Sequence, residues 1–378
     1  TSHIAILARS LELPLVFVDD PRLLRLRRED RVLLDADNGN IYINPTEDVE
    51  SSFARKLEGQ DFELLSRLVE PETWTKDGTR VTLRANINLL LDLRTALAFK
   101  AEGIGLYRTE FPFIVRSDFP TEQEQFVIYQ KLVRAMPEGP ITFRTLDIGG
   151  DKVLSYYDYG KEKNPFLGMR SIRFSLRHKD IFRQQLRAIL RAGQEADLRV
   201  MFPMISSVDE FVEARQEVFD CIEELHRQGL DCHARPQVGM MVELPSVMEI
   251  LDELAQEADF FSIGTNDFIQ YMLAVDRTNE KVAELYLPHH PSVLRALKRI
   301  VETACRHHKE VSVCGDMSYD ERYLPFFLGI GVRAFSIDPH LIPRIQQTIQ
   351  KIDLAAARQT ADEWVREHTI AGVLWRLS

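Results

Sequence analysis

The sequence is short of cysteine, of basic charge and of long apolar stretches. Its 378 residues include four cysteines, and none of them forms a C-x-x-C pair, so no disulfide framework is expected. No apolar run approaches the roughly 20 residues that a helix needs to cross a bilayer. The formal net charge is −11, which argues against nucleic acid as the main partner because that partner attracts basic surfaces.

These absences favour a reduced, cytoplasmic protein. Residues Thr1 to Ala8 contain no basic start followed by an apolar block, so a secretory leader is not expected there. Hydrophobic residues make up 45% of the chain, which is enough for a sizeable core. The length suits two or three domains of about 150 residues, or one large barrel of about 250 residues with smaller parts.

Short apolar runs alternate with longer amphipathic segments from Val81 onward. The strand candidates are 81–87, 103–111, 141–150, 198–205, 238–244, 259–267, 310–317 and 334–339. Helical periodicity is found at 122–135, 168–192, 207–228, 245–255 and 293–309. About eight βα repeats in roughly 270 residues are typical of an α/β fold, a parallel (β/α)8 barrel of the TIM type. The even spacing of the runs favours this closed barrel over a doubly wound open sheet.

The segments outside the repeat are assigned to smaller parts. Residues 1–45 combine a helical start, a strand expected at LPLVFV and two strands about a turn, which is too little for a complete domain. Residues 46–79 are charged and partly helical, and they are interpreted as a linker helix. The barrel is expected over 80–352. Residues 353–378 are expected to form a helical tail that exposes Trp364, Leu374 and Trp375 and therefore packs on another surface.

Polar side chains follow most of the expected strands. In a parallel barrel the carboxyl ends of all strands open on one face, where α/β proteins keep their chemistry. The residues at those ends are Asn86, Arg108, Glu110, Arg144, Asp147, Pro203, Glu243, Asn266, Asp267, Cys314 and Asp316. Arginines, carboxylates and one thiol are therefore expected to converge.

Glu243 and Asp267 end adjacent expected strands. Two carboxylates with spare coordination sites suit Mg²⁺ or Mn²⁺, which take hard oxygen ligands together with substrate phosphate. Each carboxylate taken alone is as readily interpreted as a helix cap or an arginine partner. The combination of both, beside Thr265 and Asn266, favours a metal site.

Arg108, Arg144 and Arg277 are candidates for a guanidinium cluster around a phosphoryl group. Arginine recognises phosphate and carboxylate through paired hydrogen bonds, and Lys152, in GGDK, adds a point charge. The alternative is ordinary salt bridges with nearby carboxylates, at Glu110, Asp147 and Asp276. Gly149 and Gly150 either allow a close approach of the backbone to a ligand or mark a turn.

Cys314 and His3 are the candidate reactive groups. Cys314 ends a strand among the charged residues, where a thiol can act as a general acid or a nucleophile. The other cysteines, Cys221, Cys232 and Cys305, are interpreted as structural. His3 lies in Thr-Ser-His at the start of a helix, where hydroxyls and helix N-terminal amides are able to hold a phosphoryl group.

Several long motifs, in their order along the chain, resemble the phosphoenolpyruvate (PEP)-utilising enzymes. They are TSHIAILARSLELP, LYRTEF, FRTLDIGGDK, NPFLGMRSIRF, MFPMISSVDE, GMMVELPS, FFSIGTNDFIQYMLAVDRTN and SVCGDM. Within that family they are similar to the enzyme I group of the bacterial phosphotransferase system, the PEP–protein phosphotransferases. NPFLGMRSIRF and the ending GVLWRLS resemble the nitrogen-related branch of that group more than the sugar-transport branch.

The resemblance implies a role for each matching residue. His3 matches the phosphorylated histidine, and 1–45 match the C-terminal part of its swivelling domain. Glu243 and Asp267 match the Mg²⁺ ligands. The residues that match the substrate-binding group are Arg108, Arg144, Lys152, Asn266, Asp267 and Arg277. Cys314 matches the acid that protonates the enolate carbon to yield pyruvate, and Asp316 stands where a glutamate is expected.

The implied function is transfer of the PEP phosphoryl group to His3 and on to a histidine of a small carrier protein. A homodimer formed through the barrel is implied as well, with no nucleic acid and no membrane insertion. Pyruvate phosphate dikinase and PEP synthase are alternatives that add a nucleotide-binding domain, and the sequence contains no Walker-type loop. A non-catalytic regulatory protein on the same barrel is a third alternative, against which the intact Cys314, Arg277 and Glu243 argue.

Overall fold

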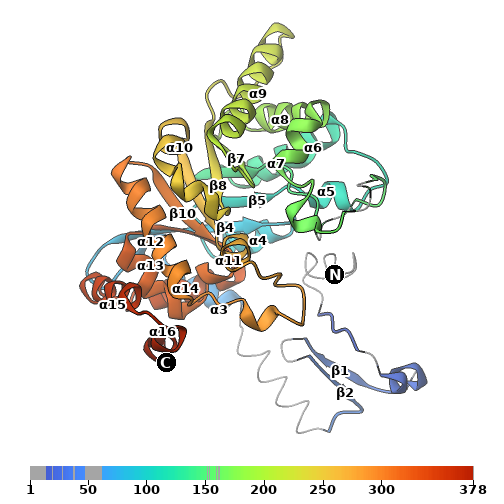
Figure 1. The fold of residues 1–378 in the computed structure, drawn as a ribbon. Helices are drawn as coiled ribbons and strands as arrows, with labels where there is room; N and C mark the ends of the chain where they lie inside the picture. The colour runs from blue at the N-terminus through green and yellow to red at the C-terminus, as the bar shows by residue number, and fades with distance from the viewer. Residues whose placement is uncertain are drawn as a thin grey trace. The chain divides into compact units, whose positions relative to one another are not determined.

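The structure, a computed structural model, describes residues 14–18, 20–27, 29–36, 39–46, 62–150, 152, 154–158, 160 and 162–377. Contacts within the chain divide it into two compact units, Thr1–Leu68 and the much larger Val69–Ser378. Figure 1 shows the elements of both units along the chain. The barrel expected from Val81 onward lies wholly within the second unit.

The first unit contains a β-hairpin. Its described elements are η1 (Pro21–Arg25), β1 (Val32–Asp35), β2 (Asn40–Ile43) and α3 (Phe62–Leu68). The two strands pair antiparallel about a turn in which Gly39 has φ 68°, as the sequence predicted. The strand expected at LPLVFV was wrong: Pro14–Val18 is not a strand, since an apolar run without a partner has no ladder to join. The helix expected from Thr1 lies outside the described residues.

Within the described part of the second unit, eight parallel strands close into a barrel. They are β4 (Arg80–Ile87), β5 (Ile104–Arg108), β6 (Pro140–Arg144), β7 (Asp197–Phe202), β8 (Gln237–Val242), β9 (Phe260–Gly264), β10 (Glu310–Cys314) and β11 (Ala334–Ile337). Each strand pairs with the next, and β11 pairs back onto β4. A short strand, β3 (Thr73–Trp74), runs antiparallel beside β4. Each of the runs expected from Val81 onward overlaps one of the eight strands, so the (β/α)8 prediction is confirmed.

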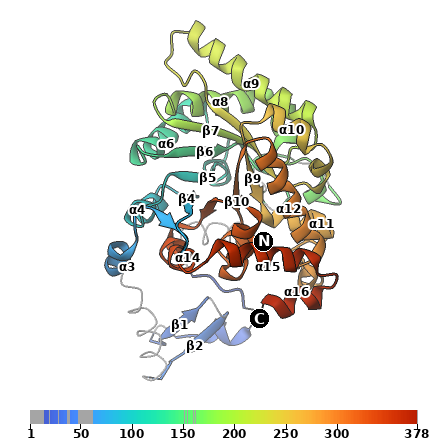
Figure 2. The same cartoon turned by 90° about the vertical axis from the view of Figure 1, so that its left-hand side faces the viewer.

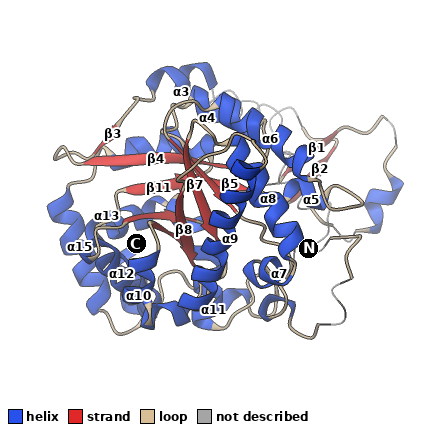
Figure 3. Cartoon of the chain, turned by 90° about the horizontal axis from the view of Figure 1, so that it is seen from above, coloured by secondary structure: helices blue, strands red, loops and turns tan. Residues whose placement is uncertain are grey.

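Helices surround these strands (Figure 3). The α-helices of the barrel are α4 (Asp92–Ala98), α5 (Phe111–Ile114), α6 (Glu122–Ala135), α7 (Ile172–Arg177), α8 (Lys179–Ala192), α9 (Val208–Arg227), α10 (Leu251–Glu257), α11 (Thr265–Leu273), α12 (Pro291–Arg306), α13 (Leu324–Ile330) and α14 (Ile342–Ile349). Short 3-10 helices are η2 (Pro165–Leu167), η3 (Pro245–Glu249), η4 (Ala283–Leu285), η5 (Asp316–Ser318), η6 (Glu321–Tyr323) and η7 (Pro339–Leu341). Figure 2 shows α4 and α6 on one side of the strands and α10 to α12 on the other.

Local sequence sets several of these boundaries. Helix α6 begins as predicted because Thr121 and Glu124 form a capping box, in which each side chain accepts a hydrogen bond from the other's backbone N–H. The helix expected over 168–192 is instead two helices. They meet at His178, whose φ of −117° and ψ of 63° are not helical.

The tail folds back onto the barrel. Its helices are α15 (Leu354–Arg366) and α16 (Ile370–Leu377). Trp364 stacks on Phe326 of α13 with ring centroids 5.8 Å apart and is 3% exposed, so the prediction that it is exposed was wrong. Leu374 and Trp375 are exposed as expected. Among the described residues, no helix is both long and apolar enough to cross a membrane.

A charged cluster lies near the amino ends of the barrel strands. Glu310, the first residue of β10, accepts hydrogen bonds from Arg84 Nη1 at 2.5 Å and from Arg199 Nη1 at 2.7 Å. Both arginines are more than nine-tenths buried. Burial alone would raise the pKa of Glu310, but the two guanidiniums outweigh it and lower that pKa to about 2. One carboxylate therefore compensates two buried cations.

Glu310→Gln is expected to lower the free energy of unfolding at pH 7 by roughly 2–3 kcal/mol, because it leaves two buried guanidiniums without a countercharge. This loss is smaller than that expected for a fully buried ion pair, because the Glu310 side chain is 38% exposed and solvent screens its charge. Wild-type protein should lose this contribution as the pH falls from about 4.3, the usual pKa of glutamate, towards about 2. Urea denaturation at several pH values measures both effects.

Glu249→Gln is the matched control, since Glu249 pairs with Arg299 in an exposed ion pair at 3.2 Å. Its unfolding free energy should change by less than about 0.5 kcal/mol. Equal effects of the two substitutions would contradict the assignment of Glu310 to a buried cluster.

Candidate functional site

The predicted site residues that the structure describes lie at the carboxyl ends of the barrel strands. Arg108, Arg144 and Cys314 are the last residues of β5, β6 and β10. Glu243 directly follows β8, and Asp267 lies in the first turn of α11, directly after β9. Because parallel strands all open on this face, the fold gathers residues that are far apart in sequence.

A buried ion cluster occupies the ends of β5 and β6. Arg144 forms ion pairs with Glu110 and with Asp147, the latter at 3.1 Å. Lys152 Nζ lies 2.9 Å from Asp147 and 3.4 Å from Glu110. The salt bridges that the sequence left as the alternative therefore exist for Arg144, yet its Nε is buried without a hydrogen-bond partner among the described residues. One donor of this buried guanidinium is therefore not used within the described protein.

The pKa values of this cluster follow from its charges. Burial would raise the pKa of Asp147, but three neighbouring cations lower it well below its usual value. Glu110 behaves in the same way, with Arg144 as the main cause of its lowered pKa. Both carboxylates therefore stay ionised and hold the cations in fixed positions.

Arg170 belongs to the site, and the sequence analysis did not single it out. It is 3% exposed, and its Nη2 donates to Asp147 Oδ1 at 3.1 Å and to Asp267 Oδ2 at 3.2 Å. It thus connects the ion cluster to a predicted metal ligand. Arg170 was missed because it precedes α7 rather than ending a strand, and its position within the quoted motif NPFLGMRSIRF was the only signal.

Gly149 explains how Arg170 comes so close. Its φ is 99°, and a Cβ there would lie 2.6 Å from the Cβ of Arg170. Gly149 and Lys152 exchange backbone hydrogen bonds of 2.9 and 3.1 Å, which close a turn. The glycine therefore serves a turn and an approach to Arg170; of the two interpretations left open, the structure shows the turn.

Glu243 and Asp267 follow the ends of adjacent strands, because β8 pairs with β9. Both side chains are buried. Glu243 Oε1 accepts the Met204 N–H at 2.6 Å. Burial, followed by the negative charges of Asp267 and Asp147, raises the pKa of Glu243 to about 8. Two buried carboxylates that repel each other are an arrangement that a divalent cation would stabilise.

The donor set fits a hard cation with few protein ligands. Among the described residues, no group of three or more histidine, cysteine or acidic side chains is arranged to hold a metal ion. Mg²⁺ commonly uses only one or two carboxylates and completes its shell with water and substrate phosphate. The pair formed by Glu243 and Asp267 suits that mode of binding better than a closed protein site.

Asn266 and Arg277 flank the carboxylate pair. Asn266 Nδ2 donates to Asp316 Oδ1 at 3.1 Å, and its Oδ1 accepts the Asp316 N–H at 2.8 Å. Arg277 Nη2 lies 4.0 Å from Asp267 Oδ1. The carboxylate of Asp276 instead accepts from the backbone and hydroxyl of Thr278. Arg277 therefore lies beside Asp267, and it also shares a hydrogen bond with Tyr286.

Cys314 is a buried thiol facing this site. Its Sγ donates to the Ile263 carbonyl at 3.3 Å and accepts from Ser262 Oγ at 3.6 Å. Burial raises the pKa of Cys314, so the thiol keeps its proton at neutral pH. Such a group is suited to donate a proton, whereas a nucleophile would require a thiolate. His3 lies outside the described residues, so its place relative to Cys314 stays a prediction.

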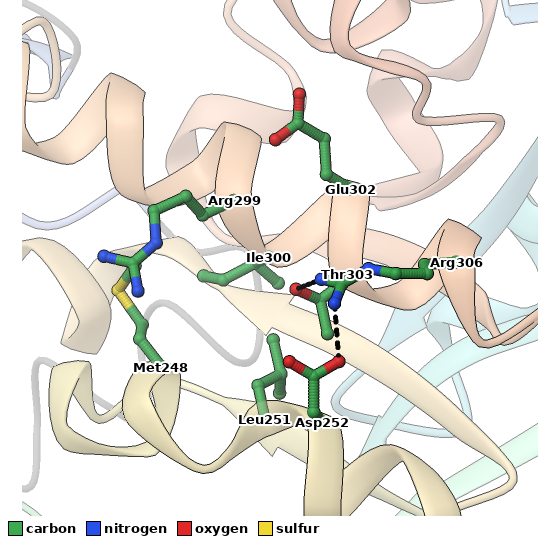
Figure 4. Close-up of a pocket in the computed structure, with 8 residues that line it drawn as sticks. All are labelled: Met248, Leu251, Asp252, Arg299, Ile300, Glu302, Thr303 and Arg306. Carbon is green, nitrogen blue, oxygen red and sulfur yellow. Dashed lines mark hydrogen bonds and ion pairs between the residues drawn. The ribbon is translucent and has the colours of Figure 1, made fainter.

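A separate cavity of 150 Å³ lies between the η3–α10 segment and α12 (Figure 4). Met248, Leu251, Asp252, Arg299, Ile300, Glu302, Thr303 and Arg306 line it. Asp252 and Arg306 face each other across it, joined at 2.9 Å. None of the predicted site residues lines this cavity, so the candidate site is defined by the strand ends and not by this hollow.

Comparison with known proteins agrees with this geometry. Residues 63–354 match the family described as PEP-utilising enzyme, PEP-binding domain. Among curated proteins, the chain is 45% identical over 362 residues to a phosphoenolpyruvate-protein phosphotransferase of Bacillus sp. (strain S). It is 44% identical over 355 residues to that of Geobacillus stearothermophilus and 40% identical over 381 residues to that of Listeria innocua.

The matches extend over 95%, 93% and 99% of this chain but 62%, 61% and 66% of those three relatives. The chain therefore spans somewhat over three fifths of the length of the curated relatives it matches. Among solved structures, a citrate lyase from Burkholderia xenovorans covers 68% of this chain and 86% of its own, with 18% identity and a TM-score of 0.37. The barrel assignment rests on the strand pairing.

Asp147→Asn is expected to destabilise the protein by about 3–5 kcal/mol, because it leaves two buried guanidiniums, Arg144 and Arg170, and the partly exposed Lys152 with too little countercharge. Urea unfolding at pH 7 measures this loss. Asp118→Asn is the control, since Asp118 is 73% exposed and lies 3.5 Å from Arg116. That variant should lose less than about 1 kcal/mol, and a comparably small loss for Asp147→Asn would be inconsistent with its central place in the cluster.

Proposed function

The chain belongs to the family of PEP-utilising enzymes, and from that membership we propose that it takes part in PEP–protein phosphotransfer. PEP binds at the carboxyl end of the barrel, and its phosphoryl group passes to His3 and then to a histidine of a small carrier protein. The observation that carries this proposal is the buried carboxylate pair, Glu243 and Asp267, beside the buried guanidinium of Arg144, whose Nε has no hydrogen-bond partner among the described residues.

The guanidiniums supply a binding site for a phosphate and a carboxylate. Arg108, Arg144 and Arg170 approach from the β5 and β6 side, and Lys152 adds a cation held by Asp147. Asn266 and Arg277 approach from the opposite side, after β9, and are suited to the carboxylate of PEP. In the transition state of phosphoryl transfer, negative charge is spread over the phosphoryl oxygens, so catalysis consists mainly of positioning and charge stabilisation.

Glu243 and Asp267 would hold a divalent cation, Mg²⁺ in the first instance and Mn²⁺ as a possible substitute. When bound, the cation supplies positive charge that offsets the phosphate and enolate oxygens. The two carboxylates themselves orient that charge, since Met204 fixes one oxygen of Glu243 and Arg170 one oxygen of Asp267.

The proposed reaction has two steps, transfer of the phosphoryl group and protonation of the enolate. The imidazole nitrogen of His3 forms a bond to phosphorus as the bond from phosphorus to the enol oxygen breaks, and the electron pair stays on the enolate. Cys314 then gives its proton to the methylene carbon, which yields pyruvate, and the thiolate recovers a proton from solvent. The raised pKa of Cys314 fits an acid that is protonated before the reaction.

Further parts of the proposal concern partners and setting. A histidine-containing carrier protein is the acceptor, and a homodimer formed through the barrel is the proposed assembly. All four cysteines are free thiols, which supports the reducing environment of the cytoplasm. The assignment to the nitrogen-related branch stays a prediction, as does 1–45 as the C-terminal part of a phosphohistidine domain.

Glu243→Gln tests the site itself. Isothermal titration of wild-type chain should show PEP binding that requires Mg²⁺, and the variant should require a much higher Mg²⁺ concentration and lose most of the affinity for PEP. Because Glu243 has a pKa of about 8 without metal, Mg²⁺ has to displace a proton. Apparent Mg²⁺ affinity of wild type should therefore fall about tenfold per pH unit below 8 and level off above it.

Glu257→Gln, at an ion pair with Arg215 on the outer helices, is the control and should titrate like wild type. Magnesium binding that is independent of pH from 6 to 9 would exclude Glu243 as a ligand. Absence of any PEP binding by the wild-type chain would overturn the proposed function.

Cys314→Ala is expected to bind PEP within about twofold of wild type and to release pyruvate at least ~100-fold more slowly, since general acid catalysis contributes 10²–10⁴-fold. Pyruvate release with a histidine-containing carrier protein measures this. Cys305→Ala, at an exposed thiol on α12, should behave as wild type.

Turnover that depends on a nucleotide would point instead to a dikinase or synthase. Near-normal turnover by Cys314→Ala would exclude it as the acid.

A further inference from the structure

Tyr271 lies on α11 four residues after Asp267. Residues four apart share one face of a helix, so the phenol and the carboxylate stand side by side. Arg170 spans both groups: its Nη1 donates to Tyr271 Oη at 2.8 Å and its Nη2 to Asp267 Oδ2 at 3.2 Å. Tyr271 therefore fixes the position of Nη1 of Arg170.

The same hydroxyl holds the segment that follows β6. Tyr271 Oη donates to the carbonyl oxygen of Phe166, in η2, at 2.7 Å. The guanidinium carbon of Arg170 lies 5.9 Å from the centroid of the Phe166 ring. A phenol has one proton to donate and lone pairs to accept, and here both capacities are used. One oxygen thus joins α11, η2 and Arg170.

We propose that Tyr271 is a positioning residue, which aligns Arg170 for the phosphate of the substrate and fixes η2 against α11. This inference rests on the proposed function, because it assigns Arg170 to substrate phosphate. The remaining contacts of Arg170 leave it little freedom, since Nη2 also donates to Asp147 and Nε donates to Ser171 Oγ at 3.3 Å.

A neutral group is suited to this task. Arg170 already pairs with two carboxylates, Asp147 and Asp267, and a third in place of the phenol would repel an incoming phosphate. Burial raises the pKa of Tyr271 to about 12, so the hydroxyl stays uncharged. The phenol therefore sets the geometry of Arg170 without adding negative charge to the site.

Tyr271→Phe keeps the ring and removes only the hydroxyl. The dissociation constant of PEP, measured by isothermal titration with Mg²⁺, is expected to rise about tenfold, the loss typical of one charge-assisted hydrogen bond. The melting temperature should fall by no more than about 2–4 °C. In turnover with the carrier protein, KM should rise while kcat stays within about twofold, because alignment of Arg170 serves binding.

Tyr156→Phe is the matched control. Tyr156 lies in the same segment after β6, and its hydroxyl donates to the Phe113 carbonyl at 2.9 Å, away from Arg170. This variant should bind PEP as wild type does. If Tyr271→Phe leaves the affinity unchanged, or if both variants weaken binding equally, the assignment to Arg170 is overturned.

A double-mutant cycle with Arg170→Lys tests the route of the effect. In the lysine background, Tyr271→Phe should weaken PEP binding further by less than about twofold, because the aligned guanidinium is already gone. A full tenfold loss in that background would show that the phenol acts by another route and would overturn the proposal.

Amide hydrogen exchange of residues 165–170 is measured in the protein without ligand. It therefore requires neither PEP binding nor a folded Arg170→Lys variant. Exchange there should be roughly tenfold faster in Tyr271→Phe and unchanged in Tyr156→Phe. Unchanged exchange in Tyr271→Phe would overturn the tie between η2 and α11. If the wild-type chain protects residues 165–170 from exchange but does not bind PEP, the proposed function is wrong, whereas the link between η2 and α11 through Tyr271 is supported.

Discussion

The carboxylate of Asp147 is the contact on which the rest of the site depends. It lies within hydrogen-bonding or ion-pairing distance of Arg144, Lys152 and Arg170, and all four residues come from the single stretch that runs from the last residue of β6 to the start of α7. Buried cations repel one another, so they remain together only where a buried negative charge compensates them. Asp147 supplies that charge together with Glu110 and Asp267, and it holds Arg144 and Arg170 in fixed positions beside the carboxylate pair.

The two ends of the barrel use charge in opposite ways. Near the amino ends of the strands, Glu310 pairs with Arg84 and Arg199 and closes the interior, which contributes stability. At the carboxyl ends, burial and then the charges of Asp267 and Asp147 raise the pKa of Glu243, so ionising Glu243 there costs free energy in the absence of a cation. A cost of this kind is typical of functional sites, where ligand binding offsets it.

Helix α11 concentrates the site because it begins at the point where β9 ends. Its first turn presents Asn266 and Asp267, and one turn later Tyr271 reaches back to Arg170. Asp316, which stands where the family resemblance led us to expect glutamate, holds both polar atoms of the Asn266 amide. Substrate, cation and supporting hydrogen bonds are thus arranged from one strand-to-helix junction and the segment after β6.

The sequence by itself determined the barrel, its eight strands and the residues at the strand ends, because alternating apolar runs and amphipathic stretches are local patterns. It also identified Glu243, Asp267, Arg144 and Cys314 as convergent, since parallel strands share one open face. Only the tertiary structure decided the burial of Trp364 and the parts played by Arg170 and Tyr271. Those outcomes depend on contacts between side chains that are far apart in the sequence, such as Trp364 with Phe326 and Tyr271 with Arg170. Such contacts leave no periodic pattern in the sequence.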